Sequence, residues 1–433
     1  MSTNSDPESE KSTIQPPSSP PTSSPPPDGG FKAWIVVAGA WCCLFCSFGY
    51  VNCIGLFEAQ YQRDQLREYS HSTVAWITSL EKTDDPQVGI MYFSMAGNGI
   101  VYDRWGPVPL LVVGTFLHVF GLMMASLSTQ YYQILLSQSI CSALGASALF
   151  TAATSPVGSW FLKRRALAFG IVASGSSLGG VILPVIVTRM LPNAGFPWAM
   201  RTCAFLFLVL LIPACFTVRA RTPPAPRGFA LGPLYRPFLH ETAFRLNALG
   251  LLFFSWGMFV PFNFLPLEAE HRGMRPELAN YMISVLNAAS IFGRIVPGYL
   301  GDRVGRFNVM VVTTLMSAVF VLALWLPSPQ GSNAATVAFA IVFGVSSGTF
   351  VGMTPALVQT LSPVDEIGAR MGATFALMSG AVLTGNPIAG ALVQRDGGGY
   401  AYLKVFCGCA MAVGSGLLFA ARIKLGGWGW KRV

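Results

Sequence analysis

One arginine lies alone in an apolar stretch, and its chemistry calls for an explanation before that of any other residue. Between Tyr281 and Leu300 the only charged residue is Arg294. On a helix, the spacing of Asn287, Ser290 and Arg294 places all three on one face. A full charge at bilayer depth costs at least about 2.5 kcal/mol, so such a residue faces a cavity or a partner. The pattern predicts that Arg294 binds an anionic ligand, and the alternative is an arginine satisfied by carbonyl groups of neighbouring helices.

A charged motif follows this stretch and occurs twice in the chain. A shared displacement at four positions indicates an internal duplication, as in many transporters. An aspartate at the end of one helix can bond the start of another across an interface, which predicts a gate that is made in one state and broken in the other. The alternative is a solvated tight turn. Gly99, Asp103, Arg104 and Gly106 recur at one displacement as Gly298, Asp302, Arg303 and Gly305, and Arg306 follows the second copy.

The composition is that of a chain that crosses a membrane many times. Of 433 residues, 52% are hydrophobic and 11% are charged, whereas about a quarter of the residues of soluble domains are charged. The net charge of +9 could indicate nucleic acid. Basic residues also collect in the cytosolic loops of membrane proteins, so we expect the lipid bilayer as a partner and no nucleic acid. The nine cysteines fall in apolar runs without metal spacing, and we expect no metal and no cofactor.

Apolar segments of about 20 residues are long enough to span a bilayer. They predict an all-α membrane protein of twelve transmembrane helices in two six-helix pseudo-repeats. The expected spans are 33–57, 73–102, 108–128, 132–158, 166–190, 199–219, 243–267, 278–301, 308–327, 334–361, 371–394 and 400–421. The expected division is a disordered cytosolic tail without signal peptide at 1–30, an N-terminal bundle at 31–219, a cytosolic linker at 220–242, a C-terminal bundle at 243–422 and a cytosolic tail at 423–433.

The distribution of basic residues sets the expected orientation. An even number of spans leaves both termini on one side, and most of the 28 Lys and Arg residues then lie on that side. Because cytosolic loops carry the excess of Lys and Arg, this pattern predicts cytosolic termini. The plasma membrane is the expected location, and the chain is expected to function as a monomer.

Three motifs give the chain a resemblance to a known family. Gly298 to Arg306 fits G-x-x-x-D-R-x-G-R, and the first copy lacks only the final arginine. DGGFKAW precedes the first span, and WFLKRRALAFGIVASGSSLGG leads into the fifth. The chain therefore resembles the major facilitator superfamily and, within it, the fungal branch of the monocarboxylate porter family. The motif residues in these two stretches are Asp28, Gly29, Gly30, Trp34, Lys163, Arg164, Arg165, Gly175 and Gly179.

The resemblance implies secondary active transport of a small organic anion, a monocarboxylate above all, by alternating access. The family's first-helix lysine falls on Asn52 and its eighth-helix aspartate on Ser290, while the arginine remains as Arg294. Proton coupling is therefore open, and a uniporter, an exporter or coupling through His118 all fit. His118 is otherwise an interhelical hydrogen-bonding residue. The expected substrate-binding residues are Arg294, Ser290, Asn52, Asn287 and His118.

A second departure concerns the predicted second span. The family has apolar residues where this chain has EKTDDPQ, Glu81 to Gln87. If these charges stay outside the bilayer, Val88 to Tyr102 spans only about 22 Å of a core about 30 Å thick. Either the helix is short, or the segment reflects a gene-model error that sequencing the transcript would reveal.

Two alternatives to anion transport follow from these departures. One is efflux of a fungal secondary metabolite, and the other is a non-transporting receptor or inactive remnant, should the second helix be broken. Catalysis is not expected, because the G-x-S-x-G pattern at Gly175 to Gly179 lies in a predicted membrane helix and not at a strand-to-helix turn. Small-residue faces at Gly175 and Gly179, and at Gly344, Gly348 and Gly352, predict close helix packing that could let one bundle rock on the other.

Overall fold

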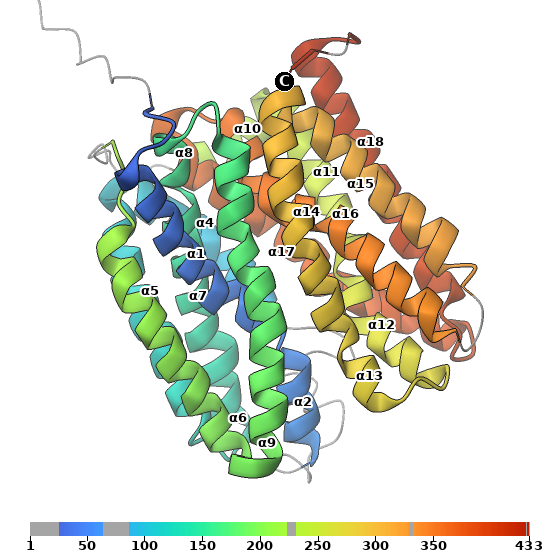
Figure 1. The fold of residues 1–433 in the computed structure, drawn as a ribbon. Helices are drawn as coiled ribbons and strands as arrows, with labels where there is room; N and C mark the ends of the chain where they lie inside the picture. The colour runs from blue at the N-terminus through green and yellow to red at the C-terminus, as the bar shows by residue number, and fades with distance from the viewer. Residues whose placement is uncertain (1–25, 64–85, 223–230, 329–331, 430, 433) are drawn as a thin grey trace, which may run out of the picture.

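The structure, a computed structural model, describes residues 26–63, 86–222, 231–328, 332–429 and 431–432. Within these ranges the chain forms helices and no β-strand. The long helices stand side by side in two groups, as Figure 1 shows. The expected all-α class is therefore confirmed for the described part of the chain.

The first group holds the helices that precede residue 220. The fourth span of this group contains a π-helical stretch, η1, and the last helix bends where Gly195 has a φ of 78°. The elements are α1 (Phe31–Val51), α2 (Ile54–Arg63), α4 (Pro86–Trp105), α5 (Pro107–Ala125), α6 (Tyr131–Ile134), η1 (Leu135–Ser142), α7 (Ala143–Thr154), α8 (Val157–Trp160) and α9 (Arg165–Thr217).

The second group follows a short helix that links the two groups. Its elements are α10 (Gly232–His240), which is that linking helix, α11 (Thr242–Met258), α12 (Val260–His271), α13 (Pro276–Asn280), α14 (Met282–Val304), α15 (Arg306–Phe320), η2 (Val321–Trp325), α16 (Asn333–Thr360), η3 (Val364–Glu366), α17 (Ile367–Arg395) and α18 (Ala401–Gly426). The stretch 220–242 was expected to be a cytosolic linker, and within it the structure forms α10.

Ten of the described helical stretches are long and apolar enough to cross a membrane. One of them, α9, holds two of the predicted spans, because a positive φ at Gly195 breaks the helix into two arms. The helix α4 supplies the remaining span. The large apolar side chains that point outward, such as Phe116 and Phe216, suit a lipid surrounding. The described helices therefore match the twelve predicted spans.

The described part of the second predicted span is the helix α4. The helix α4 runs from Pro86 to Trp105, 20 residues, which corresponds to a rise of about 30 Å. Its apolar part is still short, because the helix ends in Asp103, Arg104 and Trp105, and α4 is not among the ten helices that are apolar enough to span. Residues 64–85, which include the charged run from Glu81, lie outside the described residues. The hypothesis of a gene-model error at 81–87 stays a prediction.

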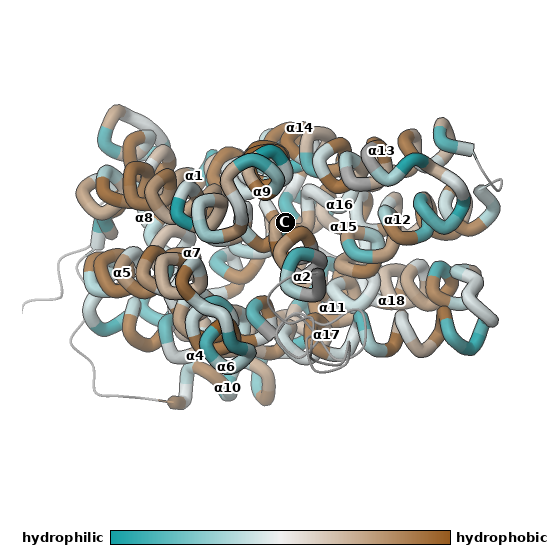
Figure 2. Tube along the Cα trace, turned by 90° about the horizontal axis from the view of Figure 1, so that it is seen from below, coloured by the Kyte–Doolittle hydropathy of each residue, from teal (hydrophilic) through white to brown (hydrophobic). Residues whose placement is uncertain are grey.

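The two groups pack against each other along two pairs of helices. The helix α4 packs on α17, and α14 packs on α9. Figure 2, which shows the helices nearly end-on, places α1, α4, α5 and α7 on one side and α11, α12, α16 and α18 on the other. We call the groups the first and second halves. The side that holds the start of α1 and the end of α18 is called the terminal side, and the opposite side is called the far side.

Candidate functional site

Arg294 lies near the middle of α14, buried against α9 of the first half. Its Nη1 donates to the carbonyl of Ala173 and to the hydroxyl of Ser176. Its Nε is buried without a hydrogen-bond partner, and no carboxylate of the described ranges forms an ion pair with it. A guanidinium held by neutral groups alone in a low-dielectric site attracts an anion strongly.

Three other predicted site residues form a row beside Arg294. Asn287 Nδ2 donates to Asn52 Oδ1 at 2.8 Å, which joins the second half to the first. The hydroxyl of Ser290 donates to the carbonyl of Asn287 at 2.9 Å and lies 2.6 Å from the hydroxyl of Ser177. The structure therefore brings together Asn52, Asn287 and Ser290, as the sequence predicted.

Asn52 sits at a break in the first span. The helix α1 ends at Val51 and α2 begins at Ile54. Asn52 Nδ2 donates to the carbonyls of Phe48 and Gly49, at 3.2 and 3.3 Å, which lack full helical partners at this end. Interrupted helices whose irregular backbone lines a site are common in transporters.

An aromatic cluster at the junction of the halves was missed by the sequence prediction. The ring of Tyr92 lies 5.8 Å from Phe48 of the first half, and 5.4 and 6.3 Å from Phe375 and Phe259 of the second. Tyr92 also interacts electrostatically with Arg294. The cluster and the polar row are therefore neighbours. Apolar rings are frequent in membrane helices, so no local signal in the sequence marked these as a group.

His118 does not lie with these residues. Its ring is buried in the first half, where Nε2 lies 3.1 Å from the carbonyl of Cys46 and Nδ1 lies 2.9 Å from the hydroxyl of Ser142. With the proton on Nε2, the ring donates to Cys46 and accepts from Ser142. It also stacks on Phe207 at 5.3 Å. These contacts match the alternative of an interhelical hydrogen-bonding residue, and a role of His118 in substrate binding stays a prediction.

The first copy of the repeated motif joins the two halves on the terminal side. The carboxylate of Asp103, at the end of α4, accepts the backbone N–H of Gly368 at 2.8 Å and that of Ala369 at 2.7 Å. These are free donors in the first turn of α17, where a helix also favours negative charge. Gly99 allows this approach, because a Cβ there would collide with the Gly368 carbonyl.

The second copy makes the matching contact between the other pair of helices. Asp302, at the end of α14, accepts the N–H of Ala166 at 3.0 Å and that of Leu167 at 2.8 Å in the first turn of α9. Arg306 Nε donates to Asp302 at 3.2 Å. At Gly298 a Cβ would crowd the carbonyl of Ala166. Two carboxylates thus cap helix starts across the interface. We call these contacts the Asp103 latch and the Asp302 latch.

Arg104 and Arg303 take no part in the latches. Both are exposed, and their guanidinium groups lie over the rings of Trp105 and Tyr299 at 4.9 and 4.3 Å. The prediction grouped them with the aspartates because they are adjacent in sequence. On a helix, adjacent residues point in directions about 100° apart, so the interface that holds the aspartate turns the arginine outward.

Arg165 and Gln359 form a further connection on the terminal side. Arg165 Nη1 donates to the Gln359 carbonyl at 3.3 Å, and Gln359 Nε2 donates to the carbonyl of Thr154 at 3.2 Å. Both side chains are buried, and they link α16 to α7 and α9. The sequence prediction placed Arg165 only among the motif residues and missed Gln359. A polar residue at the end of a predicted span was the available signal.

The two motif stretches that precede the first and fifth spans contact each other. Asp28 Oδ1 accepts the N–H groups of Leu162 and Lys163, both at 2.6 Å. The ring of Trp34 meets Phe161 edge-on at 5.1 Å. Lys163 and Arg164 are exposed, and Gly29 has no neighbouring atoms that a Cβ would meet. Gly30 precedes α1 with a φ of 86°, which favours glycine.

The small-residue faces pack mostly within the halves, but Gly352 also lies against Gly170 of α9 in the first half. At Gly175 and Gly179 a Cβ would collide with backbone carbonyls of α1. Gly344 and Gly348 pack in the same way on α14, and Gly352 lies against it. The close approaches between the halves occur instead at other glycines, such as Gly99 and Gly298. The predicted close packing is confirmed, and the role of these faces in rocking stays a prediction.

No group of three or more His, Cys, Asp or Glu side chains suited to a metal occurs among the residues that the structure places. The arrangement at the junction instead offers one cation, several neutral hydrogen-bonding groups and an aromatic surface. Such a set can bind an organic molecule that carries a negative charge.

Comparisons with known proteins agree with this architecture. The family model described as Major Facilitator Superfamily matches residues 40–385. "MFS-type transporter 1" of Ophiocordyceps sp. is 49% identical over 427 residues, 98% of this chain and 92% of that protein. The "Fujikurins efflux protein" of Gibberella fujikuroi is 45% identical over 399 residues, 92% of this chain and 83% of that protein.

A solved structure supports the fold. The major facilitator superfamily transporter FucP, in its outward conformation, superposes with a TM-score of 0.68, covering 89% of this chain and 98% of that one. The sequences are 13% identical, so this likeness concerns the fold alone. The family model and the relatives show more, and this chain belongs to the major facilitator superfamily as a multi-pass membrane transporter, not an enzyme.

Proposed function

We propose that this transporter exports a fungal secondary metabolite that carries an acidic group. The observation that carries the proposal is the buried Arg294, which no described carboxylate neutralises. Efflux is supported by the relative named for export of fujikurins. The aromatic cluster around Tyr92 suits the apolar body of such a molecule better than it suits a small hydrophilic acid.

The transport cycle is proposed to be alternating access between two bundles, residues 31–219 and 243–422. In the state described, both latches are made on the terminal side. If that side is cytosolic, as the basic residues predict, this state receives no substrate from the cytosol. Breaking the latches would then open Arg294 to the cytosol. We place the protein in the plasma membrane, as a monomer.

The experiment compares metabolites inside and outside cells with and without the gene, at two external pH values. Export predicts loss of an acidic metabolite from the medium when the gene is absent, and recovery with the wild-type gene. Arg294→Ala should lower export by about 10- to 100-fold, the value of a hydrogen bond to a charged group. Arg395→Ala, which removes an exposed arginine, is the matched control and should export normally.

Two results would redirect the assignment. Normal export by Arg294→Ala, at equal protein level, would contradict the proposal that Arg294 binds the acidic group of the substrate. Uptake or release of a simple monocarboxylate, with no change in larger metabolites, would support the second candidate, a monocarboxylate porter. That candidate rests on the retained arginine at position 294. The absence of any flux would favour a non-transporting receptor.

A further inference from the structure

The linking helix α10 has two apolar faces. Leu234 and Phe238 are half-buried and turn toward the seam between α4 and α17. On the adjacent, exposed face Leu231, Tyr235 and Leu239 follow one another at every fourth position, with 56, 52 and 63% of their surface exposed. A helix with exposed apolar residues beside charged ones lies in the interface of a membrane.

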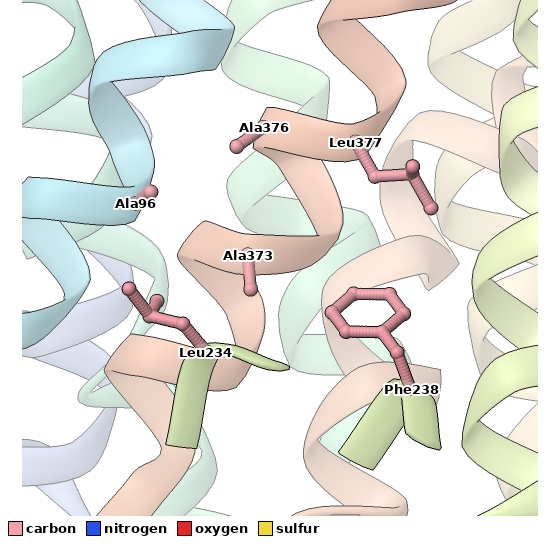
Figure 3. A pocket seen from close by; sticks show the side chains of 6 residues that line it. All are labelled: Ala96, Leu234, Phe238, Ala373, Ala376 and Leu377. Carbon is pink, nitrogen blue, oxygen red and sulfur yellow. The ribbon is translucent and has the colours of Figure 1, made fainter. Parts of the chain in front are cut away.

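An apolar pocket of about 310 Å³ lies under the covered face. Its wall has three parts, because α4 belongs to the first half, α17 to the second, and α10 links them. Figure 3 shows the side chains converging on one space between these helices. The lining residues are Ala96 of α4, Leu234 and Phe238 of α10, and Ala373, Ala376 and Leu377 of α17. All six are apolar, so the pocket suits a hydrocarbon chain.

Exposed basic side chains lie on α10 and at the start of α11, in the segment that supplies Leu234 and Phe238 to the pocket. Arg236 and His240 of α10 are exposed, as is Arg245 of α11, whose Nη1 reaches the carbonyl of Leu239 at 3.5 Å. The nearby carboxylate of Glu241 is already paired, because Arg370 binds both of its oxygens at 2.7 and 2.8 Å. The exposed arginines at this end of α10 therefore have no acidic side chain of α10 or Glu241 to neutralise them, and they suit an anionic head group.

We propose that one anionic phospholipid, from the leaflet on the terminal side, binds here. Its acyl chain occupies the pocket, and its phosphate lies between Arg236 and Arg245. The exposed face of α10 then rests among the neighbouring lipids. Charge complementarity selects this occupant over a neutral lipid or an apolar segment of another protein. The inference needs only a membrane-embedded chain and does not depend on the transported substrate.

Occupancy of this site favours the state described. Ala96 and Ala376 lie on different halves, and the pocket lies along the same seam as the Asp103 latch. Separation of α4 from α17 would dismantle the wall. A ligand that binds one state alone shifts the equilibrium toward that state. The bound lipid therefore stabilises the closed terminal side.

The test uses the full-length protein in nanodiscs of phosphatidylcholine, with and without phosphatidylserine, and counts retained lipids by native mass spectrometry. One retained phosphatidylserine is expected. Arg236→Ala with Arg245→Ala should lower its retention by up to about 25-fold, since each arginine near an anionic surface contributes about fivefold. Arg189→Ala with Arg395→Ala makes the same change of charge at other exposed positions and should leave retention unchanged.

A second variant tests the pocket separately. Ala376→Leu fills the space and should lower retention although all charges remain. The control is Gly416→Leu on α18, where an added side chain meets no neighbouring atom. Equal retention of phosphatidylcholine and phosphatidylserine, or unchanged retention in Ala376→Leu, would overturn the proposal. Retention of a protein partner or of a second copy of the chain in place of lipid would overturn it as well.

Discussion

Two buried cations of the second half differ in how their charge is balanced. Lys404 Nζ lies 2.5 Å from Glu268 Oε1 and donates to the carbonyl of Trp325. Arg272 contacts the same carboxylate at 2.7 Å. Arg294 has only the neutral partners Ala173 and Ser176. A buried cation with a carboxylate holds structure, whereas one without a carboxylate is available to a ligand. For this reason we assign the substrate to Arg294.

The first prediction concerns the structural cation. Glu268→Gln leaves Lys404 buried without a counter-ion, and removing one member of a buried pair costs about 3 to 5 kcal/mol. The variant should melt at a clearly lower temperature in detergent, as measured by fluorescence of the unfolding protein. Glu270→Gln removes the same charge from an exposed position of α12 and should melt like the wild type.

A double variant separates two contributions to the lost stability. One is the loss of attraction between Glu268 and Lys404, and the other is the cost of leaving Lys404 charged and buried without a counter-ion. Glu268→Gln combined with Lys404→Met removes both charges, so it should recover much of the stability that Glu268→Gln loses. A double variant that melts even lower than Glu268→Gln would contradict a paired role and would point to hydrogen bonding, such as that of Trp325 to Glu268.

The second prediction concerns His118. Its two ring nitrogens connect α5 with α1 and η1, and a glutamine can also donate one hydrogen bond and accept another. His118→Gln should therefore keep the same dependence of transport on external pH. His118→Ala should lower the melting temperature, because buried polar partners lose their bonds. A changed pH profile in His118→Gln, at normal stability, would instead assign a proton-transfer role to this residue.

At the scale of helices, the third prediction concerns two glycines of α4. At Gly99 a Cβ would collide with the Gly368 carbonyl, whereas at Gly97 it would meet no atom within 4 Å. Gly99→Ala should therefore force α4 away from α17 and weaken the Asp103 latch. Gly97→Ala should leave the latch intact and stabilise the helix by about 1 kcal/mol. Distances between labels on Trp105→Cys and Val364→Cys, both exposed, would report the separation.

The labelling is practical because one of the nine cysteines, Cys409, is exposed. Replacing Cys409 with serine leaves the two introduced cysteines as the main sites for a thiol-reactive label. A longer label distance is expected in Gly99→Ala than in Gly97→Ala. Equal distances in both variants would show that the seam tolerates a methyl group and that close packing at Gly99 is not needed for closure.

The elements were more predictable from the sequence than their contacts. Membrane helices follow from long apolar runs, because backbone groups in lipid must bond within their own segment. The break at Asn52 was not predicted, since it is flanked by apolar residues. The helix α10 was missed because it is short and lies in a polar loop. It packs on α11 and α17, and a local sequence pattern does not contain such contacts.

Prediction of the site was limited in the same way. Helical spacing correctly grouped Asn287, Ser290 and Arg294. It could not show that Ser176 and Ser177 of α9 supply their partners, because that depends on how the halves pack. His118 was one open alternative for proton coupling, and the sequence did not reveal its partners Cys46 and Ser142, because they lie on other helices.

For the whole molecule, the repeated motif joins the halves at two related places. Asp103 connects α4 to α17, and Asp302 connects α14 to α9. Each half thus supplies one carboxylate and one helix start. Both contacts lie on the terminal side, so both must break before that side opens. We therefore propose that the two latches act on one equilibrium between closed and open states.

The last prediction tests this shared equilibrium. In Asp103→Asn and in Asp302→Asn, an NH2 group replaces one of the two acceptor oxygens. This donor then faces a backbone N–H, so one hydrogen bond of the latch is lost. Each change should cost about 1 to 2 kcal/mol and lower the closed-to-open ratio about 5- to 30-fold. If both latches act on one equilibrium, the double variant should show the product of the two factors, measured with the same pair of labels. A double variant no more open than the stronger single variant would mean that one latch alone controls the terminal side.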